Sequence, residues 1–397
     1  MSSHHRILVA AFGDAGHAFP AIGLARGLKA RGHEVVVETW EQWREAVEEL
    51  GLGFTAAEEY STFPPPPPGS GGPSAADAAQ ALLPFLEQER FDVVVSDILT
   101  QAPALAAERV GCRRATLIPH VYPVHEPGMP FFAFGAMPPR TPVGRAVWRA
   151  ALPVLIGGLK RGREEMNDSR AVLDLPPLER FHGGISEQLA LVATFPQLEY
   201  PRAWPPEVRV TGPIGFELPY PDIELPPGEE PLVLVAASTA QDPDCRLVQV
   251  ALEALADEPV RVLATTNRQR PAEPLPEAPG NAVVVDWLSY SQALAAADLM
   301  ICHGGHGTIA RALGAGVPAL CCPAVGDMAE NGARVAWAGA GLMLPWRLMA
   351  SATLRTAVRR VLSDGTFGVR AGEISAWARA NDGAGRGAKL VEDLART

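Results

Sequence analysis

The chain has 397 residues, 47% of them hydrophobic and 20% charged, and a formal net charge of −11. This length exceeds one ordinary core and predicts two domains, and the acidic balance argues against a nucleic-acid partner, because phosphate backbones need a basic surface. Five scattered cysteines without a CxxC pair indicate reduced thiols in a cytoplasmic protein and no zinc site. No apolar run reaches about 18 residues, so neither a signal peptide nor a membrane span is expected.

The first part of the chain alternates between strand and helix patterns. Residues 6–12 form a buried apolar run, residues 19–30 have helical spacing, and residues 34–38 form a second apolar run. Strand, helix and strand at this spacing make a βαβ unit, which implies a parallel sheet. The proline and glycine tract over 64–72 is interpreted as a surface loop. The alternation then resumes with a strand at 91–95, a helix at 101–109 and a strand at 115–119.

A second α/β block begins at Pro231, after a proline-rich stretch that we interpret as a linker. It is predicted to hold strands at 232–236, 260–264, 282–285 and helices at 247–255 and 291–297. Two such blocks predict an α/β fold of two facing Rossmann-like domains with parallel sheets, and ligands then bind in the cleft outside the strand ends. The predicted domains are residues 1–215, the linker 216–230, residues 231–372, and a helical segment 373–397 that packs back on the first domain.

The strongest functional signal is a glycine-rich turn. A strand-like run over 299–302 leads into the sequence His303-Gly304-Gly305-His306-Gly307-Thr308, and a helix pattern starts directly after it. Glycines let a ligand approach the backbone, and the first N–H groups of a helix point at an anion together with the positive end of the helix dipole. The sequence therefore predicts a phosphate-bearing ligand at this turn.

A family resemblance follows from this turn and its surroundings. The pattern W…HGGxGT…GVP…P…GD…N, together with Gly16-His17-x-x-Pro20, resembles the nucleotide-sugar-dependent glycosyltransferases of family 1, above all bacterial natural-product members. The resemblance covers nearly the whole chain and implies the GT-B fold, with an interdomain cleft. It also implies inverting, metal-independent transfer of a sugar from a UDP- or dTDP-sugar to a hydroxyl of a hydrophobic small molecule, without a cofactor. The choice between a monomer and a homodimer stays open.

The resemblance assigns roles to individual residues. His17 is the expected general base, because an imidazole accepts a proton near neutral pH, and Asp97 is expected to orient it. His303 and Thr308 are expected at the diphosphate. The complete expected donor set is Ser238, Trp287, Leu288, His303, Gly305, His306, Gly307, Thr308, Asp327, Met328 and Asn331. The expected acceptor set is Phe12, His120, Tyr122, Phe131, Phe132 and Phe134.

Three positions depart from the family pattern. Ser289-Tyr290 stands where a Pro-Gln usually follows the tryptophan. Met328 stands where a glutamine usually follows the sugar-binding acid, which favours a deoxygenated or modified sugar. Arg311 stands where plant members have a ribose-binding glutamate, so the nucleoside stays open between uridine and thymidine.

Several alternatives stay open beside this interpretation. Asp242 and Asp244 could hold a divalent metal, although acidic residues are also favoured where a helix begins. The basic and apolar segment 145–163 could rest on a membrane surface, but a helix with solvated charges is the expected explanation. For the activity, the alternatives are a nucleotide-sugar epimerase of the same fold and a non-catalytic nucleotide-sugar-binding partner protein.

Overall fold

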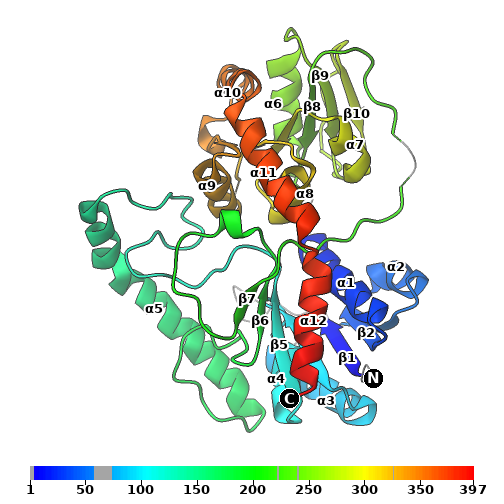
Figure 1. The fold of residues 1–397 in the computed structure, drawn as a ribbon, viewed down its shortest axis with the longest axis vertical. Helices are drawn as coiled ribbons and strands as arrows, with labels where there is room; N and C mark the ends of the chain where they lie inside the picture. The colour runs from blue at the N-terminus through cyan, green and yellow to red at the C-terminus, as the bar shows by residue number, and fades with distance from the viewer. Residues whose placement is uncertain (1–3, 58–73, 221–222, 239–240, 325) are drawn as a thin grey trace.

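The structure, a computed structural model, describes residues 4–57, 74–220, 223–238, 241–324 and 326–397. Two α/β halves lie one above the other, and a long helix extends to the side of the lower half (Figure 1). The proline and glycine tract over 64–72 lies outside the described residues. All five cysteines are free, and within the described ranges no helix is long and apolar enough to cross a membrane.

The first half contains a sheet of seven parallel strands in the order β3-β2-β1-β4-β5-β6-β7. Helices α1 and α12 cover one face of the sheet and helices α3 and α4 cover the other, so the central strands are buried on both sides. The strands are β1 (Arg6–Ala10), β2 (Glu34–Thr39), β3 (Gly53–Ala56), β4 (Val93–Asp97), β5 (Arg113–Ile118), β6 (Ala190–Val192) and β7 (Val208–Val210). The helices are α1 (Ala15–Ala30), α2 (Arg44–Glu49), α3 (Ala75–Glu89), α4 (Gln101–Arg109), α5 (Pro142–Val172) and, from the end of the chain, α12 (Gly383–Ala395).

The second half contains six parallel strands in the order β10-β9-β8-β11-β12-β13. Helices α6 and α10 pack on one face, and α7, α8, α9 and α11 on the other. The strands are β8 (Leu232–Ala236), β9 (Arg261–Thr265), β10 (Ala282–Val285), β11 (Leu299–Cys302), β12 (Ala319–Cys321) and β13 (Gly341–Met343). The helices are α6 (Arg246–Leu255), α7 (Tyr290–Ala296), α8 (His306–Ala315), α9 (Met328–Ala338), α10 (Ser351–Ser363) and α11 (Thr366–Ala380).

The C-terminal helices cross from the second half to the first (Figure 1). Helix α11 packs against α8, whereas α12 packs against α1 and places Ala388 and Val391 in the core of the first sheet. At the crossing, a Cβ on Gly383 would lie 2.3 Å from the carbonyl oxygen of Pro213, so only glycine fits there. The two halves are therefore joined twice, by the linker after β7 and by the start of α12.

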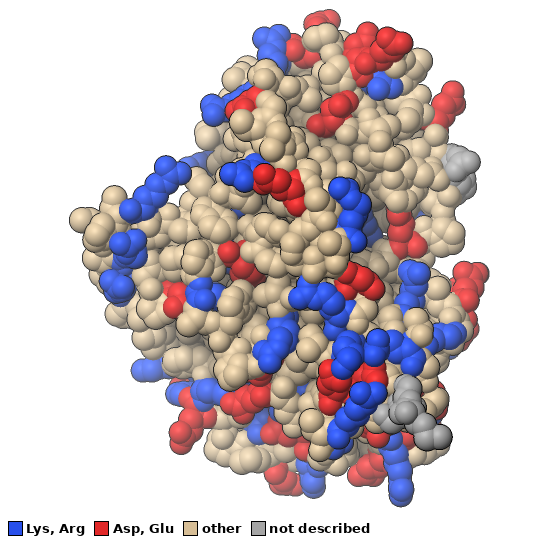
Figure 2. All heavy atoms as spheres, viewed as in Figure 1, with Lys and Arg blue, Asp and Glu red and all other residues tan. Residues whose placement is uncertain are grey.

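Helix α5 is the arm that extends from the first half, and Figure 2 shows Lys and Arg side chains along it. Val143 and Val154 on this helix are exposed, while Trp148 packs against Phe131 with ring centroids 5.2 Å apart. The segment 145–163 is thus helical, and it is anchored on the first half through an aromatic contact.

The parallel sheets and the Rossmann-like architecture of both halves agree with the sequence prediction, but several boundaries differ, and two of these differences concern predicted site residues. Helix α1 begins at Ala15, not at Phe19, so His17 lies in the first turn of a helix instead of in a loop. Strand β4 ends at Asp97, not at Val95, so Asp97 is the last residue of the strand. Both corrections place the two residues at the carboxyl edge of the first sheet.

Candidate functional site

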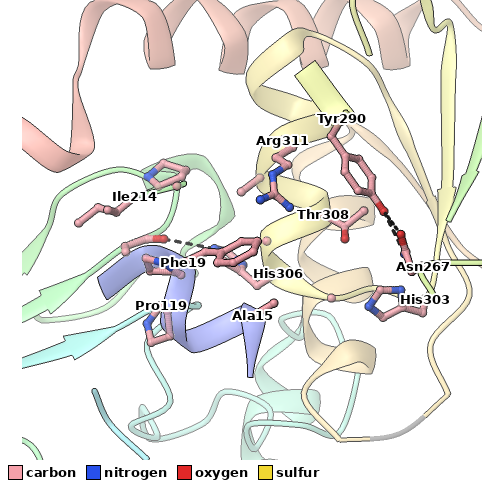
Figure 3. A pocket seen from close by; sticks show the side chains of 18 of the residues that line it. Ala15, Phe19, Pro119, Ile214, Asn267, Tyr290, His303, His306, Thr308 and Arg311 are labelled. Carbon is pink, nitrogen blue, oxygen red and sulfur yellow. Dashed lines mark hydrogen bonds between the residues drawn. The ribbon is translucent and has the colours of Figure 1, made fainter. Parts of the chain in front are cut away.

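A cavity of about 290 Å³ lies between the two halves (Figure 3). From the first half it is lined by the start of α1 and by the residues that follow β5 and β6, and from the second half by the start of α8. Its walls therefore come from the carboxyl ends of strands in both sheets, which is where ligands bind in open α/β sheets. The lining residues that belong to the predicted donor set are Trp287, His303, Gly305, His306, Gly307 and Thr308.

The start of α8 is open toward this cavity. Gly305 is the N-cap residue, no acidic residue lies in the first turn, and no atom lies within 4 Å of the position that a Cβ on Gly307 would take. A Cβ on Gly305, in contrast, would lie 2.3 Å from Nε2 of His303, so glycine lets the imidazole pack against the turn. The first N–H groups of α8 and its dipole can thus act on an anion in the cavity.

The two histidines of the glycine-rich turn are buried and neutral at pH 7. Burial disfavours the imidazolium form and lowers the pKa of both His303 and His306 to about 4. Nε2 of His306 donates a hydrogen bond to the carbonyl oxygen of Ala193 at 3.3 Å, which joins α8 to the first half (Figure 3). Nδ1 of His303 has no hydrogen-bond partner among the described residues.

His17 and Asp97 meet beside this cavity. Nδ1 of His17 donates to Oδ2 of Asp97 at 2.7 Å, and Oδ1 of Asp97 accepts the backbone N–H of Leu99 at 2.8 Å. Burial disfavours the imidazolium of His17, but the charge and the hydrogen bond of Asp97, together with the charges of Asp327 and Asp14, outweigh burial, and the pKa of His17 is raised. A ring fixed through Nδ1 keeps Nε2 as its second nitrogen, which accepts a proton when the ring is neutral.

The predicted sugar-binding residues brace the glycine-rich turn from the start of α9. Nδ2 of Asn331 donates to the carbonyl oxygen of Gly304 at 3.1 Å and to Oδ2 of Asp327 at 3.2 Å. Gly304 has a φ of +89°, and a Cβ there would lie 2.8 Å from the carbonyl oxygen of Met328. None of the three predicted residues lines the 290 Å³ cavity.

Two further predicted donor residues lie outside the cavity lining. Ser238 is buried, and its Oγ accepts the backbone N–H of Gln241 at 3.0 Å. Leu288 is 1% exposed and belongs to the core, whereas its neighbour Trp287 lines the cavity. Trp287 and Leu288 therefore face different sides of the loop that follows β10.

Two of the predicted acceptor residues lie beside His17, and a third stacks on one of them. The ring of Phe12 lies 6.2 Å from the imidazole of His17 and 4.9 Å from the ring of Trp40. His120 lies 6.4 Å from His17 and stacks on Phe132 at 5.7 Å. Nδ1 of His120 donates to the carbonyl oxygen of Val121, and burial lowers the pKa of this histidine.

The other predicted acceptor residues lie apart from His17. Tyr122 and Phe131 are buried and pack against Trp204 and Trp148 respectively. Phe134 is 66% exposed and touches Phe131 from the outside. Tyr122 and Phe131 thus serve as core residues of the region that precedes α5.

Three polar residues that the sequence analysis did not assign to the site line the cavity: Asn267, Tyr290 and Arg311. Nδ2 of Asn267 donates to the carbonyl oxygen of Ala237 at 2.6 Å and to the hydroxyl of Tyr290 at 3.1 Å (Figure 3). Asn267 follows β9 with a φ of +51°, a conformation that asparagine tolerates. A polar residue at the carboxyl end of a parallel strand was the available signal.

Of the two aspartates that were considered as a metal site, Asp242 has a structural role. Oδ1 and Oδ2 of Asp242 accept the backbone N–H groups of Arg246 and Leu247 at 2.9 and 3.0 Å. The carboxylate of Asp242 therefore caps the start of α6, where a negative charge is favoured.

Comparison with known proteins identifies relatives over the whole chain. One family model, described as "Erythromycin biosynthesis protein CIII-like, C-terminal domain", matches residues 249–384, and a "Glycosyl transferase 4-like domain" matches residues 21–155. The 4'-demethylrebeccamycin synthase of Lentzea aerocolonigenes is 30% identical over 424 aligned residues, which cover 98% of this chain and 99% of that protein. The O-mycaminosyltylonolide 6-deoxyallosyltransferase of Streptomyces fradiae is 29% identical, with 99% and 98% covered.

Solved structures share the architecture. The glycotransferase of kitacinnamycin superposes with a TM-score of 0.79 at 22% identity, covering 99% of this chain and 100% of that one. The glycosyltransferase VinC, solved in complex with dTDP, gives a TM-score of 0.70 at 20% identity, with 98% and 99% covered. These similarities show the GT-B fold, and the whole-length relatives show the family. The chain belongs to the nucleotide-sugar-dependent glycosyltransferases of family 1, of the bacterial natural-product type.

Proposed function

We propose that this glycosyltransferase moves a sugar from a dTDP- or UDP-sugar to a hydroxyl of a hydrophobic small molecule, with inversion at the anomeric carbon. The observation that carries the proposal is the 2.7 Å contact between His17 and Asp97, beside a cavity whose opposite wall is the open start of α8. A proton acceptor and an anion site thus lie on opposite sides of one cleft.

In this mechanism His17 is the general base. Nε2 of neutral His17 takes the proton of the acceptor hydroxyl while the oxygen attacks the anomeric carbon. The bond from that carbon to the diphosphate breaks on the opposite face, and the nucleoside diphosphate leaves with the electron pair. Asp97 holds the tautomer of His17 and stabilises the imidazolium that forms. The N–H groups at the start of α8 stabilise the growing negative charge of the leaving group, so the proposal needs no divalent metal.

The relatives support the choice of donor. VinC was solved with dTDP, and the Streptomyces fradiae relative is named as a 6-deoxyallosyltransferase. Met328 replaces a hydrogen-bonding side chain at the start of α9 with an apolar one. We therefore propose a deoxygenated sugar, carried by dTDP, as the first donor to test. Phe12, His120 and Phe132 around His17 are the proposed contacts of the acceptor.

The test is the His17→Ala variant, assayed with dTDP- and UDP-sugars against aromatic and polyketide-like acceptors by mass spectrometry. We expect kcat to fall by roughly 100- to 10,000-fold, the range of general-base catalysis, while calorimetry shows unchanged binding of the nucleotide. The matched control is His5→Ala, since His5 lies before β1 at the opposite edge of the sheet. Wild-type turnover in His17→Ala would disprove the role of this base.

The same assay separates the two alternatives. An epimerase would convert the nucleotide sugar without any acceptor, and a binding protein would bind the nucleotide without transfer to any member of the panel. The anomeric configuration of the product, measured by NMR, tests inversion directly.

A further inference from the structure

Arg311 is the only lysine or arginine among the described residues that line the cavity. It lies on α8, half-buried, and its Nη2 donates to the carbonyl oxygen of Phe216 at 2.9 Å. Its guanidinium also lies 5.3 Å from the ring centroid of Tyr290 and 5.8 Å from that of Phe19. Contacts from the linker and from both halves therefore hold this cation at the cavity (Figure 3).

The position of Arg311 along α8 directs it toward the expected anion site. Side chains on a helix lean toward its N-terminus, so Arg311 covers the turn before it. Gly307 lies four residues earlier, has no side chain, and leaves open space on the cavity side. The guanidinium of Arg311 and the first N–H groups of α8 are thus directed toward the same part of the cavity, where an anion can meet both.

Arg311 differs in charge from the other groups at the cavity that can meet an anion. His303 and His306 are neutral at pH 7, because burial lowers the pKa of each to about 4. The helix start contributes only partial charge. A diphosphate is an anion, and the nucleoside diphosphate that leaves carries more negative charge than the donor did. Among the described lining residues, only Arg311 brings a full positive charge to meet it.

Resting on the proposed function, we propose that Arg311 binds the diphosphate of the donor and stabilises the departing nucleoside diphosphate. A guanidinium carries several N–H donors and no acceptor, so it suits phosphate oxygens. It cannot accept a hydrogen bond from a ribose hydroxyl, as a carboxylate at this position would. Only one of its N–H groups is committed to Phe216, which leaves others for the ligand.

The experiment is isothermal titration of dTDP and of thymidine, and of UDP and uridine, into the wild type, Arg311→Gln and Arg311→Lys. We expect Arg311→Gln to weaken binding of the diphosphate by about 10- to 100-fold, the scale of a hydrogen bond to a charged group, and to change nucleoside binding by less than about twofold. Arg311→Lys keeps the charge and should recover part of the loss. The loss in Arg311→Gln should also diminish as salt is added.

The matched control is Arg268→Gln. The guanidinium of Arg268 lies 4.6 Å from the ring centroid of Trp287 and is not part of the cavity lining. This variant should change the affinities for diphosphate and nucleoside by the same factor, so the ratio of the two is the readout. If thermal unfolding shows that Arg311→Gln does not fold, Arg311→Lys serves as the test. In that variant we expect the ratio of the diphosphate affinity to the nucleoside affinity to fall by about three- to tenfold.

An unchanged ratio in the Arg311 variants would overturn the inference, as would equal losses for diphosphate and nucleoside. Failure of the enzyme to transfer sugar, with the ratio altered as expected, would refute the proposed function and leave the role of Arg311 in place. A wild-type protein that binds neither dTDP nor UDP would refute both.

Discussion

His17 and Asp97 show how burial and charge compete at a single residue. Burial alone would lower the pKa of His17, yet the carboxylate 2.7 Å away raises it. Only the neutral ring can accept a proton, so the proposed role of His17 as the base depends on the balance between these effects.

This balance predicts a pH dependence. We expect kcat/KM of the wild type to rise with pH through a pKa above the ordinary value of 6.5, since His17 must lose its proton first. Asp97→Asn removes the opposing charge, so the midpoint should move to lower pH and kcat should fall by about 100-fold or more. The measurement is the pH–rate profile of both proteins. A midpoint that stays in place would show that another group controls the profile.

Glu38 on β2 is a buried carboxyl without a charged partner in the part of the chain that the structure describes. It is 7% exposed, its Oε2 has no hydrogen-bond partner among the described residues, and burial raises its pKa from 4.5 to about 8. At neutral pH the folded protein therefore keeps a proton that the unfolded chain releases.

The contribution of Glu38 to stability should consequently fall between pH 5 and pH 8. In this window the carboxyl of Glu38 keeps its proton in the native state and loses it in the unfolded state, so its contribution to the free energy of unfolding decreases as pH rises, by up to roughly 1.4 kcal/mol per pH unit. Glu38→Gln should remove this decrease, so its free energy of unfolding should change more favourably with rising pH than that of the wild type, as measured by urea unfolding across the window. Glu34→Gln, at the exposed start of the same strand, is the control and should keep the wild-type slope. Equal slopes for all three proteins would contradict a protonated Glu38.

At the level of an element, the start of α8 contains one glycine required by packing and one that we propose leaves room for the ligand. Gly305 is required by the imidazole of His303, whereas Gly307 faces open space. The two glycines lie two residues apart, yet the structure assigns them different constraints.

Two alanine substitutions test this difference. Gly305→Ala should lower the free energy of unfolding by about 1–3 kcal/mol, because its Cβ must displace His303. Gly307→Ala should leave stability unchanged or raise it by about 0.4–1 kcal/mol, since its Cβ meets no atom of the protein. It should nevertheless weaken nucleotide binding, because the new methyl group occupies the ligand's position. Thermal unfolding and calorimetry measure the two effects, and equal behaviour of the variants would contradict the assignment.

At the scale of the whole molecule, a buried ionic cluster of Arg334, Glu199 and Glu330 connects the second half to the first. Nη1 of Arg334 on α9 donates to Oε2 of Glu199 in the first half at 2.9 Å, and its Nε donates to Oε1 of Glu330 at 2.9 Å. Glu199 also accepts the backbone N–H of Tyr122 at 2.6 Å. Burial raises the pKa of both carboxyls, and the charge of Arg334 opposes that shift. The relative position of the halves, and hence the cleft, depends on this cation.

Arg334→Met should destabilise the protein by about 3–5 kcal/mol, because it leaves two carboxylates buried without a counter-charge. The loss should diminish at low pH, where these carboxyls can take up protons. Denaturant unfolding measures the loss, and faster proteolysis between β7 and β8 would report loosened halves. Arg359→Met removes an exposed arginine that pairs with Glu258, so we expect no measurable loss there. Equal effects of the two variants would show that the cluster does not join the halves.

The sequence by itself determined the features that depend on neighbouring residues. Apolar runs and helical spacing identified the central strands of both sheets and several of their helices, because these patterns repeat over a few residues. They did not identify β3, β6, β7, β12 and β13, which are only three or four residues long. The strand, the glycine-rich turn and the start of α8 were predicted together for the same reason. Even His17 and Asp97, 80 positions apart, could be expected to meet, because parallel strands end at one edge of a sheet.

The tertiary structure alone decided which side chains face the cavity. Phe131 and Phe132 are neighbours in sequence, yet only Phe132 stacks on His120, while Phe131 packs toward α5. Arg311 joins the cavity wall through the carbonyl oxygen of Phe216, and Arg334 finds Glu199 in the other half. Such contacts connect segments that are far apart in the chain, and no local periodicity encodes them. They arise only when the two sheets and the linker are packed together.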